Sequence, residues 1–364
     1  MIENELARSA EVAMDCCEKL TPDFTSEPAV AGAIGRRTAL KRLAGLAGGI
    51  MFVSKRNAYG QGRQVLLAFC GQLLCVIPYE VTRARGHFAD EGLDVRLVYT
   101  RGGNVAMQAL VGGSVDYAGT SFDVALQAYA RGAKIARFAS TGRLPLFALA
   151  SAPKTAKEIR SLKDLENRTV GISALGNADH ILVLYLMKRA GADPNRVRFA
   201  TIGTNLLDAL RLGQVDAGMV QEPALSLITG AGGGVIANAM DIDEANRYLG
   251  GAYEFMGVAV RLEEREKRRD EMARLARALA KGLRDTRTIA VKEAVAALPQ
   301  ELITGSNRDR LATILERYRR SLYPDNVKID LAATNRVAEA HKAAGLLAPS
   351  VDYKALLDLS IVGS

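Results

Sequence analysis

Short apolar segments alternate with amphipathic segments through the middle of the chain. Val65–Phe69, Val115–Ser121 and Thr169–Ser173 are typical of buried strands, because each is short, mostly apolar and bounded by polar or turn-forming residues. The segments between them carry apolar residues at helical spacing, as in Asn104–Val111 and Asp179–Ala190. Strands that alternate with helices in this way predict an α/β fold with mainly parallel sheets.

The same pattern predicts two similar stretches followed by a helical C-terminal region. Further strands are expected at Leu93–Tyr99, Ile135–Ser140, Phe147–Ala150, Val197–Ile202, Val215–Val220, Val235–Ala237 and Gly257–Val260, and further helices at Tyr79–Phe88, Phe122–Arg131 and Asn205–Leu212. Asn104 is expected to cap the helix that begins there. The strands up to Ala150 are expected to complete a first sheet, and most of those after Pro153 a second. Residues 262–364 are expected to be helical, with their mixed charges facing solvent.

One sequence pattern occurs twice, at an offset of 100 residues. Ala109–Asp116 (ALVGGSVD) and Ala209–Asp216 (ALRLGQVD) are identical at five of eight positions. In each copy a glycine is expected to end a helix with a positive φ, and Val-Asp is expected to begin the next strand. Two copies of one plan predict two lobes with a cleft between them.

The N-terminal segment has the features of an export signal. Arg36–Arg37 precedes a mildly apolar segment rich in glycine and alanine, Leu43–Val53, which is too short to span a bilayer. This combination resembles a twin-arginine signal, with cleavage expected after Gly60, so residues 1–60 are interpreted as a signal segment. A short internal helix is the alternative, and the length of chain before the arginines indicates a long leading region or a start further downstream, such as Met14.

Composition narrows the classes of function. The 364 residues carry 48 Lys and Arg against 40 Asp and Glu, a net charge of +8, with basic residues scattered among acidic ones. Aromatic residues make up 5% and tryptophan is absent, so no base-stacking nucleic-acid surface is expected. The 4 Cys and 3 His have no zinc-binding spacing, and no metal site is expected. Cys70 and Cys75 are either two buried thiols or a disulfide pair.

Several motifs resemble those of a known family. Tyr79–Val95 (YEVTRARGHFADEGLDV) resembles a segment of the type II periplasmic substrate-binding proteins of ABC transporters, in the subgroup that binds nitrate, sulfonates, taurine and thiamine precursors (pyrimidines). Ala109–Asp116, Gly119–Ser121 and Lys163–Ile172 continue the resemblance, which covers about residues 62–260. These motifs indicate the fold strongly and the ligand hardly at all.

The resemblance implies two α/β lobes, each a mostly parallel sheet flanked by helices, joined by two crossing strands that act as a hinge. Lobe one would comprise residues 62–151 and 262–364, and lobe two residues 152–261, with crossings near Ala150–Pro153 and Val258–Arg261. The implied function is a monomeric periplasmic solute-binding protein, without catalysis or cofactor. It would capture a small-molecule ligand and deliver it to an ABC transporter permease in the inner membrane, with no nucleic-acid partner.

Two other functions stay open at this point. An enzyme of the same fold acts in thiamine-pyrimidine synthesis through a cysteine-rich motif and a catalytic histidine, but the chain after Gly60 has no cysteine cluster. A ligand-sensing input domain would need a helix-turn-helix ahead of the lobes, which residues 1–60 do not resemble. A Ser-His-Asp hydrolase is not indicated, because the chain has no G-x-S-x-G motif.

Ligands of open α/β sheets bind beyond the carboxyl ends of the strands, where helix N-termini present free N–H groups. The polar side chains that follow the expected strands are therefore the candidate ligand-binding residues: Gln72, Asn104, Thr120, Ser121, Ser173, Asn177, Gln221 and Glu222. Each of them could instead cap a helix. Glu222 could pair with a cationic ligand or hold the hinge side of lobe two. His180 could line the cleft or lie at the surface, and Arg143 could bind a carboxylate or sulfonate or be an ordinary loop residue.

Overall fold

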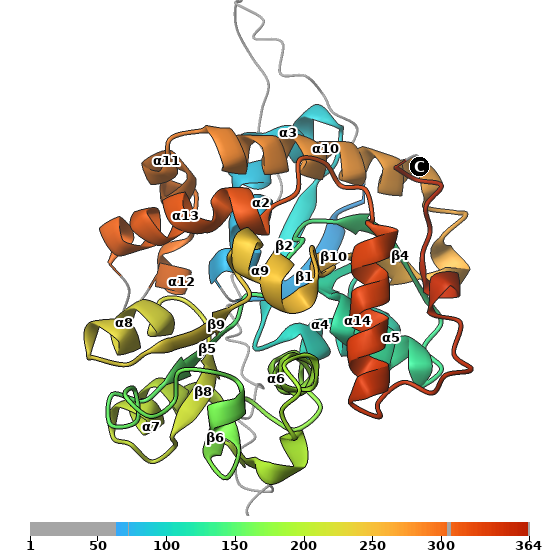
Figure 1. Cartoon of the computed structure of the whole chain (residues 1–364). Coiled ribbons are helices and arrows are strands. Elements are labelled where there is room, and N and C mark those ends of the chain that lie inside the picture. Colours follow the sequence, from blue (N-terminus) through green and yellow to red (C-terminus); the bar gives the residue numbers. More distant parts are fainter. Residues whose placement is uncertain (1–62, 72, 304–306, 363–364) are drawn as a thin grey trace, which may run out of the picture. The chain divides into compact units, whose positions relative to one another are not determined.

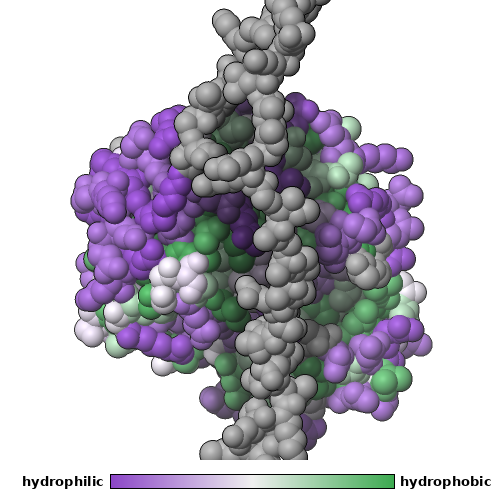
Figure 2. Space-filling model, turned by 180° about the vertical axis from the view of Figure 1, so that it is seen from behind, coloured by the Kyte–Doolittle hydropathy of each residue, from purple (hydrophilic) through white to green (hydrophobic). Residues whose placement is uncertain are grey.

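The computed structural model describes residues 63–71, 73–303 and 307–362. The expected signal segment, its cleavage after Gly60 and the candidate Gln72 lie outside the described residues. Within them, no helix is both long and apolar enough to cross a membrane. Hydrophilic residues cover much of the face of the described chain that Figure 2 shows, with hydrophobic patches between them.

The described strands form two five-stranded sheets with the same plan (Figure 1). The first sheet has the order β2 (Val95–Thr100), β1 (Val65–Cys70), β3 (Tyr117–Ser121), β10 (Met256–Arg261) and β4 (Ile135–Ser140). The second has the order β7 (Arg198–Thr201), β6 (Thr169–Ile172), β8 (Ala217–Val220), β5 (Ala148–Ser151) and β9 (Val235–Asn238). In each sheet the first three strands are parallel, and the fourth is antiparallel to both of its neighbours. The two-lobed α/β fold class predicted from the sequence is confirmed.

Helices follow most of the parallel strands and continue to the C-terminus. The α-helices are α2 (Leu73–Ala84), α3 (His87–Asp90), α4 (Gly103–Val111), α5 (Phe122–Ala130), α6 (Ala178–Arg189), α7 (Leu206–Arg211), α8 (Ala224–Gly230), α9 (Ile242–Leu249), α10 (Arg269–Thr288), α11 (Val291–Ala296), α12 (Gln300–Ile303), α13 (Arg308–Leu322) and α14 (Leu331–Ala343). Short 3-10 helices occupy Lys163–Leu165, Pro194–Arg196, Gly203–Asn205, Leu262–Glu264 and Tyr353–Leu356. The long helix α10 packs against α2 and α3, whereas α14 contacts both α5 and α6 (Figure 1). The C-terminal helices therefore return to the first sheet, and α14 also contacts a helix of the second.

The repeated sequence motif has the same structural role in both sheets. Its glycines, Gly113 and Gly213, have φ values of 79° and 67°, the left-handed conformation that a helix end requires of glycine. Its aspartates accept a hydrogen bond from the start of a neighbouring strand: Asp116 Oδ2 from the Leu66 amide, and Asp216 Oδ2 from the Thr169 amide, each at 2.8 Å. The internal repeat is therefore a structural repeat.

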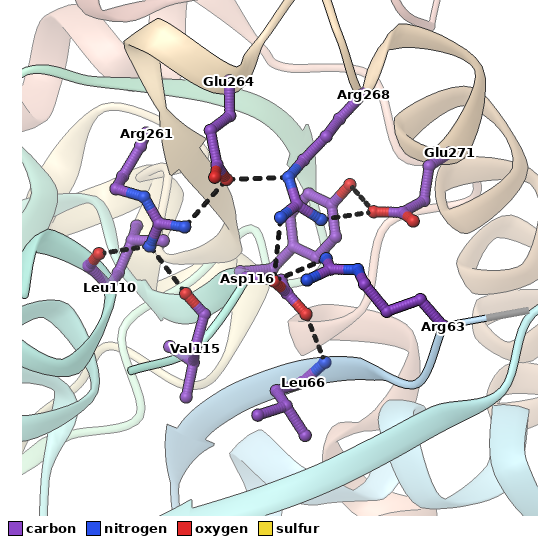
Figure 3. A network of polar contacts seen from close by, with 10 residues as sticks. Arg63, Leu66, Leu110, Val115, Asp116, Arg261, Glu264, Arg268 and Glu271 are labelled. Atoms are coloured by element: carbon purple, nitrogen blue, oxygen red, sulfur yellow. Dashed lines mark hydrogen bonds and ion pairs between the residues drawn. The ribbon is translucent and has the colours of Figure 1, made fainter. Parts of the chain in front are cut away.

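An ionic network adds to this motif in the first sheet (Figure 3). Asp116 Oδ1 pairs with Arg63 at 2.7 Å and with Arg268 at 2.9 Å, and Arg268 also binds Glu264 and Glu271 at 2.7 and 2.9 Å. These contacts lie at the amino ends of the parallel strands, opposite to the edge at which a ligand is expected. They attach the segment after β10 to the start of the first sheet.

The positions predicted for the two crossings are wrong by a few residues. Phe147–Ala150 was expected in the first sheet, but β5 belongs to the second sheet, so the chain crosses between Ser140 and Ala148. Val258–Arg261 likewise lies within β10 of the first sheet, so the second crossing comes before Met256. A short apolar strand fits either sheet equally well, and the pattern alone does not decide which. Apart from these two strands, the division of the chain into lobes stays a prediction.

The two crossing segments are hydrogen-bonded to each other. The Tyr253 amide donates to the Arg143 carbonyl at 2.9 Å, and the Phe255 amide donates to the Gly142 carbonyl at 3.0 Å. In the reverse direction, the amide of Thr141 donates to the Met256 carbonyl at 2.7 Å. The connection between the sheets is therefore a paired ribbon and not two independent strands.

Two helix starts also differ from the prediction. Helix α2 begins at Leu73, before the expected Tyr79. The sequence did not reveal this start, because Leu74 to Thr82 are all buried and the segment has no polar face that would show a helical period. Helix α4 begins at Gly103 with Gly102 at its N-cap, so Asn104 lies inside the helix and does not cap it.

Candidate ligand-binding site

A cavity of about 430 Å³ is lined by residues from both sheets. It lies at the carboxyl ends of the parallel strands, where β1 ends at Cys70, β3 at Ser121 and β8 at Val220. Its polar lining consists of Arg101, Asn104, Ser121, Gln127, Ser173, Asn177, Asp179, Gln221 and Glu222. Its apolar lining includes Phe147, Met219, Phe255 and Met256. The volume is within the range of small-molecule sites in proteins.

Ser121 presents its hydroxyl from the first sheet. It is the N-cap of α5, and its Oγ accepts a hydrogen bond from the Val124 amide at 3.3 Å. Within the described residues no acceptor takes the proton of this hydroxyl, so it can donate into the cavity. Thr120, by contrast, is fully buried, contacts the Ser121 carbonyl through its Oγ1 and does not line the cavity.

Ser173 lines the cavity from the second sheet, but its hydroxyl is already bonded. It donates to Asp179 Oδ1 at 2.7 Å and accepts from Asn177 Nδ2 at 3.0 Å, while its amide donates to Asp179 Oδ2 at 2.6 Å. Burial raises the pKa of Asp179, and the hydrogen bonds from Ser173 oppose that rise. The three side chains therefore form a chain of hydrogen bonds at the start of α6, and the Ser173 hydroxyl has no proton left for a ligand.

Glu222 is likewise held within the protein. Its two carboxylate oxygens accept from the amide and the hydroxyl of Ser226, each at 3.0 Å, and it is almost fully buried. This carboxylate caps the first turn of α8 from the side of the cavity. Gln221, the residue before it, also lines the cavity.

Two hydrogen bonds join the opposite walls of the cavity. Gln127 Nε2 in α5 donates to the Gly176 carbonyl at 2.9 Å, and Asn104 Nδ2 in α4 donates to Asn177 Oδ1 at 3.4 Å. Both connect a helix of the first sheet with the loop that precedes α6. The structure therefore has its two walls in contact across the cavity.

Three polar lining residues were not among the candidates chosen from the sequence: Arg101, Gln127 and Asp179. Arg101 is exposed, and no hydrogen bond or ion pair of its side chain is found in the described part of the chain. It directly follows β2, so its position after a strand was a usable signal. Asp179 and Gln127 lie within helices, and only the folded chain shows that they reach the cavity.

Neither of the two weaker candidates, His180 and Arg143, lines the cavity. His180 Nδ1 accepts from the Gly176 amide at 3.0 Å, its ring packs edge-on against Phe199, and burial lowers its pKa, which keeps it neutral. Arg143 donates from Nε to the Ser321 carbonyl at 2.9 Å, and its guanidinium also contacts the Arg320 carbonyl. It therefore binds the end of helix α13 and not the cavity.

Cys70 and Cys75 line the cavity as two buried thiols. A hydrogen bond to Cys70 and burial raise the pKa of Cys75, so it stays protonated. This outcome agrees with the first of the two sequence interpretations. Among the described residues, no group of three or more His, Cys, Asp and Glu side chains is placed to hold a metal ion.

The fold is similar to that of solved periplasmic binding proteins. The structure of a protein from Bordetella bronchiseptica RB50 is 22% identical, with a TM-score of 0.69, over 83% of this chain and 96% of that one. The periplasmic aliphatic sulphonate binding protein of Escherichia coli is 17% identical, with a TM-score of 0.64, over 81% and 97%. The periplasmic nitrate-binding protein of Synechocystis is 11% identical, with a TM-score of 0.65, over 81% and 85%.

The amino-acid sequence shows to which family the chain belongs. Residues 75–288 match the family described as NMT1/THI5 like, and the chain belongs to that family. No curated protein matches the chain.

Proposed function

We propose that this protein is a periplasmic solute-binding protein that captures a small organic molecule and delivers it to an ABC transporter permease. The observation that carries the proposal is the cavity of about 430 Å³ at the carboxyl ends of the strands of two sheets. Relatives in fold include proteins named for binding sulphonate and nitrate. A cavity bounded by two sheets and two crossing segments suits capture and release by hinge motion.

The lining favours an organic ligand with an anionic or strongly accepting group. Asp179 and Glu222 already accept hydrogen bonds from Ser173 and Ser226, so neither requires a cationic ligand. Arg101 is the charged lining residue left without such a partner among the described residues, and a guanidinium prefers oxyanions. The aromatic and methionine side chains on the other walls suit an apolar body.

Among the residues chosen from the sequence, we assign direct ligand contact to Asn104, Ser121 and Gln221, which line the cavity. Ser173, Asn177 and Glu222 are assigned a supporting role, because Asn177 binds Ser173, Ser173 binds Asp179, and Glu222 binds Ser226. Arg101 joins the first group. We place the hinge at the two paired segments around residues 141–147 and 250–255, and the lobes on either side of it.

A binding role is favoured over catalysis by the state of the reactive groups. Burial and a neighbouring thiol raise the pKa of Cys75, and burial lowers the pKa of His180, which does not line the cavity. An activated nucleophile beside a base is therefore not formed by these groups. The enzyme of thiamine-pyrimidine synthesis and the ligand-sensing domain are the alternatives that the experiment below separates.

We further propose export through Arg36–Arg37 to the periplasm and a monomeric state. The test begins with fractionation of cells that express the full chain, followed by a thermal-shift screen of the exported protein against organic anions, neutral and cationic metabolites. A ligand that binds only the folded state raises its melting temperature. Periplasmic recovery and stabilisation by an organic anion are expected. Cytosolic recovery, or stabilisation only by cationic compounds, would contradict the proposal.

A further inference from the structure

A second cavity, of about 370 Å³, is lined mainly by arginines. Arg284, Arg287 and Thr288 come from the last turns of α10, Arg320 from the end of α13, and Asp325 from the segment after it. None of these residues lines the ligand-binding cavity. The feature is therefore separate from the site described above, and we refer to it as the arginine pocket.

The main chain at the end of α13 holds two guanidinium groups in place at this pocket. Arg287 Nη1 donates to the carbonyls of Arg320 and Tyr323, and its Nη2 pairs with Asp325 at 2.6 Å. Arg143, from the first crossing segment, donates to the carbonyls of Arg320 and Ser321. Carbonyls at a helix C-terminus carry only partial negative charge, so they orient these cations without neutralising them.

The pocket and its neighbour Arg143 carry an excess of positive charge. Four arginines (143, 284, 287 and 320) and Asp325 sum to a net charge of +3. Asp325 pairs with Arg287, and no ion pair of the other three arginines is present in the part of the chain that the structure describes. Burial lowers the pKa of Arg143, and the positive charge of Arg287 lowers it as well. The cluster thus bears repulsion that a bound anion would relieve.

We propose that the arginine pocket binds a tetrahedral oxyanion, such as inorganic phosphate or sulfate. Arg284 and Arg320 supply guanidinium groups that no described residue engages, and guanidinium binds oxyanions through paired N–H···O contacts. Arg287 and Arg143 add positive charge from fixed positions. The pocket is larger than one such anion and admits several hydration waters with it, since a water takes about 30 Å³ in the liquid.

Phosphate alone tests this site, without knowledge of the transported ligand. The full chain is titrated with potassium phosphate, and separately with potassium chloride at equal ionic strength, by calorimetry and thermal melting. Phosphate is expected to bind and to raise the melting temperature beyond chloride. The double variant Arg284→Gln/Arg320→Gln is expected to weaken phosphate binding at least about tenfold, because it removes charged hydrogen bonds. Sulfate is expected to compete with phosphate.

The matched control is Arg310→Gln, which removes an exposed arginine of the same helix α13 outside the pocket. It is expected to bind phosphate like the parent. If the double variant does not melt cooperatively, the single exposed variant Arg284→Gln takes its place. The proposal is overturned if phosphate has no effect beyond chloride, or if the pocket variants bind it with unchanged affinity. It is also overturned if Arg101→Gln alone abolishes the effect, which would place the anion in the ligand-binding cavity.

Discussion

The two sheets have the same strand order, yet they are stabilised differently. In both, the repeated aspartate binds the amide at the start of a neighbouring strand. Asp116 also pairs with Arg63 and Arg268, whereas the described residues contain no ion pair of Asp216. The motif that is repeated in sequence therefore joins neighbouring strands in the same way in both sheets, and the ionic contacts of Asp116 distinguish the first sheet from the second.

The two walls of the cavity also differ in their hydrogen bonds. On the first sheet, Ser121 caps a helix with one lone pair and keeps its proton available. On the second, the Ser173 hydroxyl is bonded to Asp179 and Asn177. A serine at the end of β3 and a serine directly after β6 thus differ in their capacity to bind a ligand. A polar residue at a strand end is therefore placed near the cavity by topology, whereas the hydrogen-bonding atoms that it keeps free depend on its neighbours.

The largest effect is expected from the buried ion pair behind the first wall. Arg137 is fully buried, pairs with Glu254 at 2.9 Å and donates to the carbonyls of Thr120 and Phe255 at 3.0 and 2.9 Å. Arg137→Met leaves the Glu254 carboxylate buried without its partner, which typically costs about 3–5 kcal/mol. Denaturant unfolding measures this loss. The surface pair variant Arg168→Gln is the control and should change stability by less than about 1 kcal/mol.

The second prediction compares the repeated aspartates. Asp116→Asn should lower the free energy of unfolding at neutral pH by about 1.5–3 kcal/mol, because hydrogen bonds to a charged group are lost. Asp216→Asn should cost less, about 0.5–1.5 kcal/mol, since it has no ion pair in the described residues. Equal losses in urea unfolding would show that the ionic network adds nothing to the first sheet.

The pH dependence sharpens this comparison. Burial acts to raise the pKa of Asp116, but the Leu66 amide, Arg63 and Arg268 outweigh it, and the pKa is lowered. A lowered pKa means stability that is present above the unfolded value, about 3.9, and lost as the pH falls through the folded value. The difference between the parent and Asp116→Asn should therefore be constant near neutrality and shrink below about pH 4. A difference that stays constant to pH 3 would contradict the assignment.

Much of the fold could be predicted from the sequence because its signals are local. Ile135–Ser140 was predicted with its observed bounds, and the glycine ends of the repeat, Gly113 and Gly213, have the expected conformation. The sheet to which Ala148–Ser151 belongs is decided by pairing with strands about 70 and 90 residues away. No local pattern contains that information.

The ligand-binding role of the residues chosen from the sequence stays a prediction, although most of them line the cavity. Asn104, Ser121, Ser173 and Gln221 all line the cavity, since the rule of strand ends depends on topology alone. Asp179 accepts a hydrogen bond from the Ser173 hydroxyl because of the turn between the two residues. Gln127 reaches the Gly176 carbonyl because of the way in which the two walls meet. Such contacts follow from tertiary packing, so sequence spacing did not reveal them.

The third prediction concerns the charge at the cavity. Arg101→Gln should weaken binding of an organic anion by about 10- to 100-fold, because a charged hydrogen bond contributes about 1.5–3 kcal/mol. Calorimetry with the ligand found by screening measures the change. Arg131→Gln, which alters an exposed arginine outside the cavity, is the matched control and should bind like the parent. Undiminished affinity in Arg101→Gln would mean that the ligand is not held through its anionic group.

The smallest effect, and the most direct test of the two walls, comes from the paired serines. Ser121→Ala should weaken binding of a ligand by about two- to tenfold, because it removes one free donor with a net contribution of about 0.5–1.5 kcal/mol. Ser173→Ala should change affinity less and should instead lower thermal stability, since the Asp179 carboxylate loses a hydrogen bond inside the protein. Both variants are measured by calorimetry and melting under the same conditions. If Ser173→Ala loses more affinity than Ser121→Ala, the ligand contacts are concentrated on the second wall, and the difference drawn between the two strand ends is wrong.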